Sequence, residues 1–550
     1  MVLSRYLTKL NIVFAMQLIS VALAVLDVLP REAFLFSAGI FVLFALFEPI
    51  EETVFLIARS IPILVALPIT DTFDSLNMWR LIVLIIFLKW FFTPLEVRSV
   101  FGRTAGTSNN LLLTGFTSQL TAFFENLKTI FAKTSKPVEM IAFAWGKWRI
   151  EFLTALLFLI SVFSIVKADD LGVAIKRIIY FVNLGALFFV VRSIISKENI
   201  KRLALNVLIS GIIVVAVGII QLITSYLIYI DNFAEFWALQ FNQTLYGAAW
   251  ANIAINANTW FAYYYDTIHL RMFASFPDTH SFPLYLLMII CFAITLVISE
   301  KRKQFRYALY FFIALASAGL ILSGTRGIWA SIVFPMMFLI YLLWKKYADK
   351  NLLAYAAIPL IFFIALLPFS YIIFGSTQFK LKESVYKQGV LKERIKSIID
   401  TSETSNHGRI FIWKETLKSI AQNPLLGVGI GNFPTILKQN PTATKAGSSA
   451  HNLYLNTFAE LGVFGFIVFM MLIYEILKSA WKLFAGNQQL FERFFGLNAA
   501  IYLIWILWYS MTDVAIYDER AFLLLMILLG AIFAIRNYVN SSGLNQSSRA

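Results

Sequence analysis

The sequence predicts an all-α fold, that of a polytopic integral membrane protein. Hydrophobic residues make up 59% of its 550 residues and charged residues only 14%, whereas soluble domains carry roughly a quarter charged residues. The apolar residues form long blocks, and blocks such as 203–230 and 352–374 reach the ~20 residues that cross hydrocarbon. The single cysteine, Cys291, lies inside such a block, so the sequence offers neither an internal disulfide nor a cysteine-based metal site.

About fourteen apolar segments follow one another along the chain, and twelve to fourteen spans is the predicted range. The first continues from the basic Lys9 to about Leu29 without a small-residue cleavage site, which favours an uncleaved span over a signal peptide. The segments 33–47 and 53–70 are short and flank several glutamates, so merging or re-entry is an alternative. The segments begin near residues 9, 33, 53, 77, 150, 174, 203, 281, 306, 327, 352, 452, 492 and 519.

Basic connections set the predicted orientation, because Lys and Arg accumulate in cytoplasmic loops. Such residues gather in 95–148, 197–202, 301–306 and 345–350. With these segments in the cytoplasm, the alternation of spans places both termini there as well. The connections that remain on the outer face are 71–76, 168–172, 231–280, 323–327, 375–451 and 512–518.

These spans and loops divide the chain into six predicted regions. In the cytoplasmic loop, apolar residues of 111–131 recur at helical spacing, which indicates a helix lying in the membrane interface; an intracellular docking helix is the alternative. The regions are N-terminal transmembrane helices over 1–94, the cytoplasmic loop 95–148, central transmembrane helices over 149–374 with the outer loop 231–280, a large basic outer loop over 375–451, C-terminal transmembrane helices over 452–537 and a cytoplasmic tail over 538–550.

The outer loop 375–451 has an unusual charge for its predicted side of the membrane. It carries eleven Lys and Arg against five Asp and Glu, a net charge of +6, which indicates an anionic ligand. The net charge of +15 for the whole chain fits basic cytoplasmic loops, and without a basic soluble domain it does not indicate nucleic-acid binding. All four histidines also fall in the predicted outer segments.

Arg326 is a first candidate for binding that anion. It lies in Ser323-Gly324-Thr325-Arg326-Gly327, a short hairpin between two spans. An outward-facing cation in such a short loop opposes the positive-inside rule, so it indicates a function. The alternative is an arginine that reaches the lipid headgroups.

Arg409 is the second candidate. Asn406 is a plausible N-cap and Asn423-Pro424 a stop, so Arg409 is predicted in the first turn of a helix, on the same face as Trp413. A helix N-terminus and a guanidinium suit a phosphate, although a merely solvated arginine is an equal alternative. Three glycines lie beyond the helix, Gly427, Gly429 and Gly431. They predict a flexible return rather than a nucleotide-binding loop, because no strand precedes them.

His451 is the third candidate, because it stands where the basic outer loop re-enters the membrane. Asn452, Asn456 and Glu460 follow at four-residue spacing and form a polar stripe on an apolar span. A carboxylate at membrane depth needs a partner, and for Glu460 a structural hydrogen bond is an equal alternative to a role in binding.

A fourth group ends the other outer loop, where Arg271, Asp278 and His280 precede the next span. Its spacing fits no metal-site pattern, so metal binding is not expected.

In combination these motifs resemble the O-antigen ligase and polymerase superfamily. The similarity lies in Ser-Gly-Thr-Arg-Gly over 323–327, in Gly-Arg-x-x-x-Trp leading to Asn-Pro-Leu-x-Gly-x-Gly over 408–429, and in His-Asn-x-Tyr-Leu with a downstream Glu-x-Gly over 451–462. It covers roughly residues 270–480, and the order and common outer placement of the motifs make the combination more specific than any one of them.

The resemblance implies a GT-C-like fold in the bacterial inner membrane and a metal-independent, inverting glycosyltransferase without a cofactor. The donor would be a glycan on undecaprenyl diphosphate, and the acceptor a lipid core, as in lipopolysaccharide assembly. By residue matching, Arg326 and Arg409 would hold the diphosphate and His451 would act on the acceptor hydroxyl. The residues assigned to substrate binding are Arg271, Asp278, His280, Ser323, Trp413, Asn452 and Glu460.

Two alternatives remain open at the level of the sequence. A polymerase of the same superfamily would extend another lipid-linked glycan, and its donor chemistry is the same. A flippase or transporter of an anionic lipid-linked glycan would also explain the spans and the basic surfaces. It predicts charges within spans and inverted repeats with interrupted helices near the midplane, whereas the sequence shows no internal repeat and its unusual residues cluster on one face.

Overall fold

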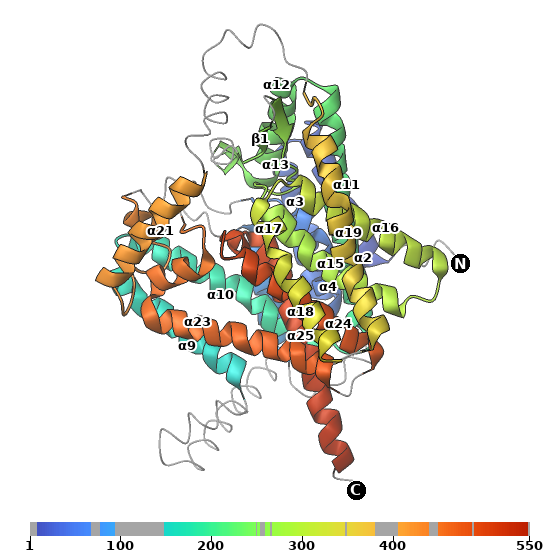
Figure 1. Ribbon diagram of the computed structural model, residues 1–550, viewed down its shortest axis with the longest axis vertical. Helices are drawn as coiled ribbons and strands as arrows, with labels where there is room; N and C mark the ends of the chain where they lie inside the picture. Colours follow the sequence, from blue (N-terminus) through green and yellow to red (C-terminus); the bar gives the residue numbers. More distant parts are fainter. Residues whose placement is uncertain are drawn as a thin grey trace.

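The computed structural model describes residues 8–67, 77–93, 148–248, 250–252, 259–264, 267–346, 349–379, 405–438, 449–486 and 489–547. Over these ranges the protein is a helical bundle, and nine of the helices described are long and apolar enough to cross a membrane (Figure 1). The predicted class, a mostly helical polytopic membrane protein, is therefore confirmed. The interfacial helix predicted over 111–131 lies outside the described residues.

Each of the fourteen predicted apolar segments coincides with a helix. Helices α3 to α5 have 14, 11 and 15 residues, fewer than the ~20 that a full span needs. The helices at these segments are α2 Lys9–Val25, α3 Phe34–Phe47, α4 Ile50–Ser60, α5 Met78–Phe92, α9 Arg149–Ser164, α10 Leu171–Ile194, α11 Ile200–Leu227, α15 Ser281–Ser299, α16 Lys303–Leu322, α17 Arg326–Ser331 continued by α18 Val333–Trp344, α19 Lys350–Phe374, α23 Leu453–Ala485, α24 Leu490–Tyr509 and α25 Glu519–Ser547.

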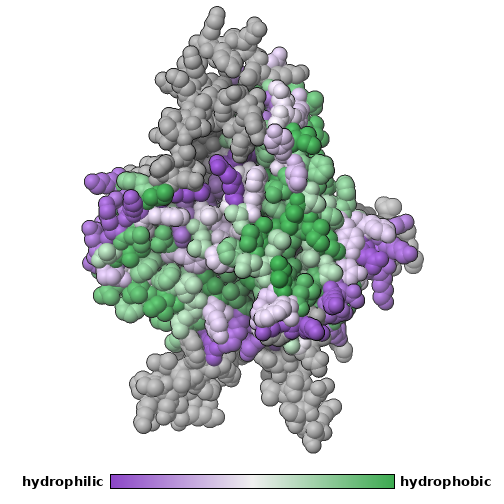
Figure 2. Space-filling model, in the orientation of Figure 1, coloured by the Kyte–Doolittle hydropathy of each residue, from purple (hydrophilic) through white to green (hydrophobic). Residues whose placement is uncertain are grey.

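The surface of the bundle is that of a membrane protein. Figure 2 shows hydrophobic residues across the middle of the molecule and hydrophilic residues gathered toward its edges. Large apolar side chains face outward, among them Phe36, Phe311 and Trp344, each with two thirds or more of its surface exposed. Exposed apolar surface of this extent marks contact with lipid or with a partner.

Helix α15 forms the centre of the bundle. It is apolar all round, and all but its last two residues are buried, because α11, α16, α24 and α25 pack around it. Its few polar groups find partners within the bundle: Tyr285 bonds Ser210, and Asn498 donates to the Thr295 hydroxyl at 3.2 Å. The N-terminus of α15 therefore holds the residue before it, His280, at a fixed place.

The outer loop predicted over 231–280 is folded and is not purely helical. It contains α12 Ile230–Phe233, a π-helix over Ala234–Phe241, α13 Asn242–Tyr246 and an antiparallel hairpin of β1 Phe261–Tyr264 and β2 Thr267–Leu270. This small hairpin departs from the all-α prediction. Aromatic residues have high strand propensity, and Phe261 of the hairpin packs on Phe233 and Phe379.

Helix α23 is broken near its N-terminal end, and the segment after α21 (Ser405–Gln422) occupies the break. Gly462 has φ 65° and ψ −170°, and Val463 donates its amide to the Pro424 carbonyl at 2.8 Å. The amides of Val428 and Gly429 donate to two carbonyls that the break leaves free, at 2.9 and 3.1 Å. The sequence predicted a flexible return here, but the structure shows a docked turn. The turn contains Gly427, Gly429 and Gly431, whose φ angles lie between 68° and 92°. Their backbone packs against neighbouring backbone or side chains, which leaves little room for a Cβ.

Candidate functional site

Two histidines and one carboxylate meet where three helices end. Nδ1 of His280, before α15, lies 3.2 Å from Oδ2 of Asp513, which follows α24. Nδ1 of His451, before α23, lies 3.7 Å from the same oxygen. The Tyr509 hydroxyl lies 3.3 Å from Nδ1 of His280. These residues are up to 233 positions apart in sequence (513 − 280), so the packing of α15, α23 and α24 alone brings them together.

His451 is held by its connection to α24. Asn452 caps α23, since its side-chain oxygen accepts the amides of Tyr454 and Leu455 at 3.0 and 3.1 Å. The Leu453 amide and the Tyr454 hydroxyl donate to carbonyls at the end of α24, each at 2.8 Å. His451 itself has φ 44°, an unfavourable conformation for a residue with a side chain. Such strain is typical of functional positions that the surrounding structure fixes.

Asp513 is the residue of this site that the sequence analysis missed. It is buried, and burial alone would raise its pKa. The imidazoles of His280 and His451 and the charge of Arg409 instead hold the pKa well below its usual value, so the carboxylate stays ionised. The available signal was the one used for Arg326, an ionisable residue in a short outer connection between two spans.

Arg271 ties the hairpin 323–327 to the segment before α15. Its Nε donates to the Ser323 carbonyl at 3.1 Å, and its Nη2 lies 3.4 Å from the Thr325 hydroxyl oxygen. That hydroxyl donates to the carbonyl of Thr279, next to His280, at 2.7 Å. Gly324, with φ 63°, packs so closely on Arg271 that an added Cβ would lie 3.1 Å from Nε. The hairpin and the histidine cluster are therefore one rigid unit.

Arg326 begins α17 at the edge of this unit. Its side chain is exposed, and it forms no ion pair with the residues that the structure describes. The next residue, Gly327, packs directly on Tyr509 and Thr512, beside Asp513. The chain at Arg326 therefore lies next to the residues that carry Asp513, and the Arg326 side chain is open to solvent.

Helix α21 carries Arg409 to the cluster. Helix α21 docks onto the segment before α23, where Trp413 donates its indole N–H to the Ala450 carbonyl at 2.9 Å. The Arg409 charge is close enough to act on both Asp513 and Tyr509. Helix α21 ends before Asn423-Pro424, as predicted, but it begins at Ser405, which places Arg409 in the second turn rather than the first.

Several predicted binding residues have structural contacts in this region. Asp278 accepts the amides of His280 and Ser281, at 2.9 and 2.8 Å, and so caps α15. Ser323 is buried and donates to the Leu320 carbonyl at 2.8 Å. Glu460 faces the docked turn after α21, with the amides of Gly431 and Phe433, the Asn456 side chain and the Arg177 charge as its neighbours. That these residues also contact substrate stays a prediction.

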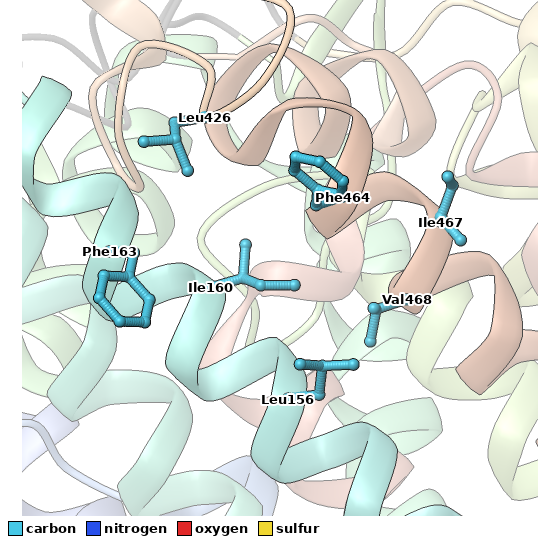
Figure 3. Close-up of a pocket in the computed structure, with 7 residues that line it drawn as sticks. All are labelled: Leu156, Ile160, Phe163, Leu426, Phe464, Ile467 and Val468. Carbon is cyan, nitrogen blue, oxygen red and sulfur yellow. The ribbon is translucent and has the colours of Figure 1, made fainter. Parts of the chain in front are cut away.

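An apolar groove lies between α9 and α23, directly below the break in α23. Figure 3 shows its lining, and the space has a volume of about 460 Å³. Leu426, at its upper end, precedes the glycine that packs against Glu460. The lining is entirely hydrophobic and consists of Leu156, Ile160, Phe163, Leu426, Phe464, Ile467 and Val468.

The fold and this site define a class: a multi-pass helical membrane protein with a cluster of histidine, aspartate and arginine at one end of its bundle. Comparison with known families narrows it. Residues 310–470 match the model of the O-antigen ligase family. The matched range contains Arg326, Arg409 and His451, whereas His280 and Asp513 lie outside it.

Two curated relatives match more distantly. A putative polysaccharide ligase of Rickettsia felis is 24% identical over 143 residues, which are 24% of this chain and 35% of that protein. An uncharacterized protein of Haemophilus influenzae is 26% identical over 183 residues, 31% of this chain and 43% of that protein. The chain thus matches less than half the length of either relative.

Proposed function

We propose that this protein transfers a glycan from undecaprenyl diphosphate to an acceptor hydroxyl at the outer face of the bacterial inner membrane, as an inverting, metal-independent ligase. The observation that carries the proposal is that His451 and Arg409, which lie in the range matching the O-antigen ligase family, meet the ionised Asp513, with Arg326 in the neighbouring hairpin. Base, carboxylate and cations are the groups that this reaction needs.

The base in this scheme is His451, with Asp513 behind it. The acceptor oxygen attacks the anomeric carbon as the bond from that carbon to the diphosphate oxygen breaks, and the hydroxyl proton passes to Nε2 of His451. Nδ1 faces the ionised Asp513 at 3.7 Å, which fixes the ring and stabilises the imidazolium as it forms. General-base catalysis of this kind typically contributes roughly 10²- to 10⁴-fold in rate.

The leaving group is undecaprenyl diphosphate, and its departure requires positive charge. In this scheme Arg326, at the start of α17, and Arg409, whose charge acts on Asp513, supply two guanidinium groups. Hydrogen bonds to charged groups are worth about 1.5–3 kcal/mol each, and more where a preorganised site meets developing charge. The direct contacts of Arg271 are with Ser323 and Thr325, so its role is to hold the hairpin that presents Arg326.

The groove between α9 and α23 supports a lipid-linked donor, since a polyisoprenyl chain needs an apolar surface that opens to lipid. The orientation follows the basic connections: both termini face the cytoplasm and the histidine cluster faces outward.

The test is a transfer assay with purified protein in nanodiscs without divalent metal. A lipid-diphosphate-linked glycan is the donor, the acceptor is either lipopolysaccharide core or a second lipid-linked glycan, and release of undecaprenyl diphosphate is measured. We expect release with one acceptor, abolished in Arg326→Ala, Arg409→Ala and His451→Ala. The matched control is Arg306→Ala, because Arg306 lies at the opposite end of the helix that leads to the Arg326 hairpin.

The acceptor decides between the alternatives. Release only with a second lipid-linked glycan would make the protein a polymerase. Normal transfer in all three variants would refute the site, and no release with either acceptor, together with movement of the glycan across the bilayer, would favour a flippase.

A further inference from the structure

His280 contacts Asp513 more closely than His451 does. Its Nδ1 lies 3.2 Å from the carboxylate oxygen, against 3.7 Å for His451, and both imidazoles approach the same oxygen. His280 is also firmly placed. Its amide is bonded to Asp278, and the helix that follows it is the buried centre of the bundle. A side chain fixed in this way can hold the carboxylate still.

The hydrogen-bond partners assign the tautomer of His280. An ionised carboxylate only accepts hydrogen bonds, so Nδ1 of His280 carries the proton and donates it to Asp513. The Tyr509 hydroxyl then donates to the carbonyl oxygen of His280, 3.4 Å away, rather than to the ring nitrogen. Burial, with the nearby charge of Arg271, lowers the pKa of His280, while Asp513 and Asp278 oppose the shift; the net effect favours a neutral ring.

We propose that His280 is a positioning residue of the transfer reaction, which holds Asp513 against His451 through its Nδ1–H. This proposal rests on the proposed function. A neutral donor orients the carboxylate without cancelling its charge, so the full charge remains to stabilise the imidazolium that forms on His451. Without His280, the described residues that still act on Asp513 are His451, the Arg409 charge and the Val514 amide, which is bonded to the other carboxylate oxygen at 2.8 Å. The carboxylate would then be free to rotate away from the base.

The test compares two substitutions of His280. His280→Gln keeps an N–H donor near Asp513, whereas His280→Leu removes it. We expect His280→Leu to lower kcat about 10- to 100-fold with little change in the KM of the donor lipid, a typical effect of losing an outer partner. His280→Gln should recover most of that loss. His269→Gln, which replaces a buried histidine of the same outer segment, is the control and should transfer normally.

A double-mutant cycle separates positioning from folding. In an Asp513→Asn background, His280→Leu should cost less than about 3-fold further, because the group it acts through is already lost. An equal loss in both backgrounds would overturn the proposal, and so would a rise in KM alone, which would make His280 a substrate contact. An equal loss of kcat in His280→Gln and His280→Leu would overturn the proposal as well.

A spectroscopic measurement tests the contact independently of turnover. Nitrogen NMR of the protein with ¹⁵N-labelled histidine in nanodiscs should show His280 as the Nδ1–H tautomer, and Asp513→Asn should shift that signal. An Nε2–H tautomer or an unshifted signal would refute the contact. If NMR shows the Nδ1–H tautomer and its dependence on Asp513 but the wild-type protein transfers no glycan, the proposed function fails. The arrangement of His280, Asp513 and His451 then still stands.

Discussion

Replacing Asp513 with asparagine tests the centre of the site with a minimal change of shape. The amide keeps the size of the side chain and one oxygen that can accept from His280 at the 3.2 Å contact. It removes the negative charge that faces Nδ1 of His451 at 3.7 Å. The substitution therefore leaves the geometry largely in place and deletes the electrostatic stabilisation of the imidazolium.

The expected loss follows from Coulomb's law. At 3.7 Å two unit charges attract with about 4 kcal/mol at an effective dielectric constant near 20 and about 1 kcal/mol in bulk water. The His451 side chain is 34% exposed and Asp513 9%, so the true value lies between these limits. A loss of about 1.5–3 kcal/mol corresponds to roughly 10- to 150-fold in kcat.

The transfer assay should show this loss in kcat with an unchanged KM for the donor, since the charge matters only once the proton moves. Asp349→Asn is the matched control. Asp349 caps α19 by accepting the Asn351 amide at 3.1 Å, and asparagine caps a helix equally well. A kcat within twofold of wild type in Asp513→Asn would refute the reasoning, because Asp513 could not then stabilise charge on the base.

Three further substitutions probe the surroundings. Gly462 has a positive φ, and Gly462→Ala places a Cβ 2.1 Å from a carbonyl oxygen of the docked turn, so the melting temperature in detergent should fall by several degrees. Gly408→Ala is the control, because its Cβ meets no atom within 4 Å and the melting temperature should stay unchanged. Trp413→Phe removes the indole bond that docks α21, and it should raise the KM of the donor several-fold because Arg409 is carried by that helix; an effect on kcat alone would contradict this role. Burial lowers the pKa of His280, so protonation of His280 favours the unfolded state, and thermal stability should decline as the pH falls below about 6.5. In His280→Gln this decline should be shallower. Identical curves of stability against pH for the two proteins would argue against burial of His280 as the cause.

The sequence was sufficient for the helical architecture because the signal for a span is local. Twenty apolar residues in a row have few stable alternatives in lipid, whatever their neighbours are. The fourteen predicted segments accordingly coincide with helices. The hairpin β1–β2 was missed because its short aromatic strands carry no length signal, and they depend on packing against Phe233 and Phe379.

For the site, the sequence identified individual candidate residues but did not predict which of them contact one another. Arg326 stood out as a cation in a short predicted outer hairpin, Arg409 by its place near a helix N-terminus, and His451 where the basic loop re-enters the membrane. The order and spacing of the three motifs made the prediction specific. The sequence did not show that Asp278 and Asn452 cap helices, because the capped amides belong to a turn whose geometry the fold sets.

The sequence by itself thus determined a polytopic helical membrane protein, and it predicted basic and imidazole groups in connections on the outer face. Only the tertiary structure decided that Asp513 lies between His280 and His451, and that the turn after α21 closes the break in α23. The physical reason is the range of the interactions. The length of an apolar segment depends only on consecutive residues of the sequence. The contact of 3.2 Å between His280 and Asp513, in contrast, forms only after α15, α23 and α24 have packed.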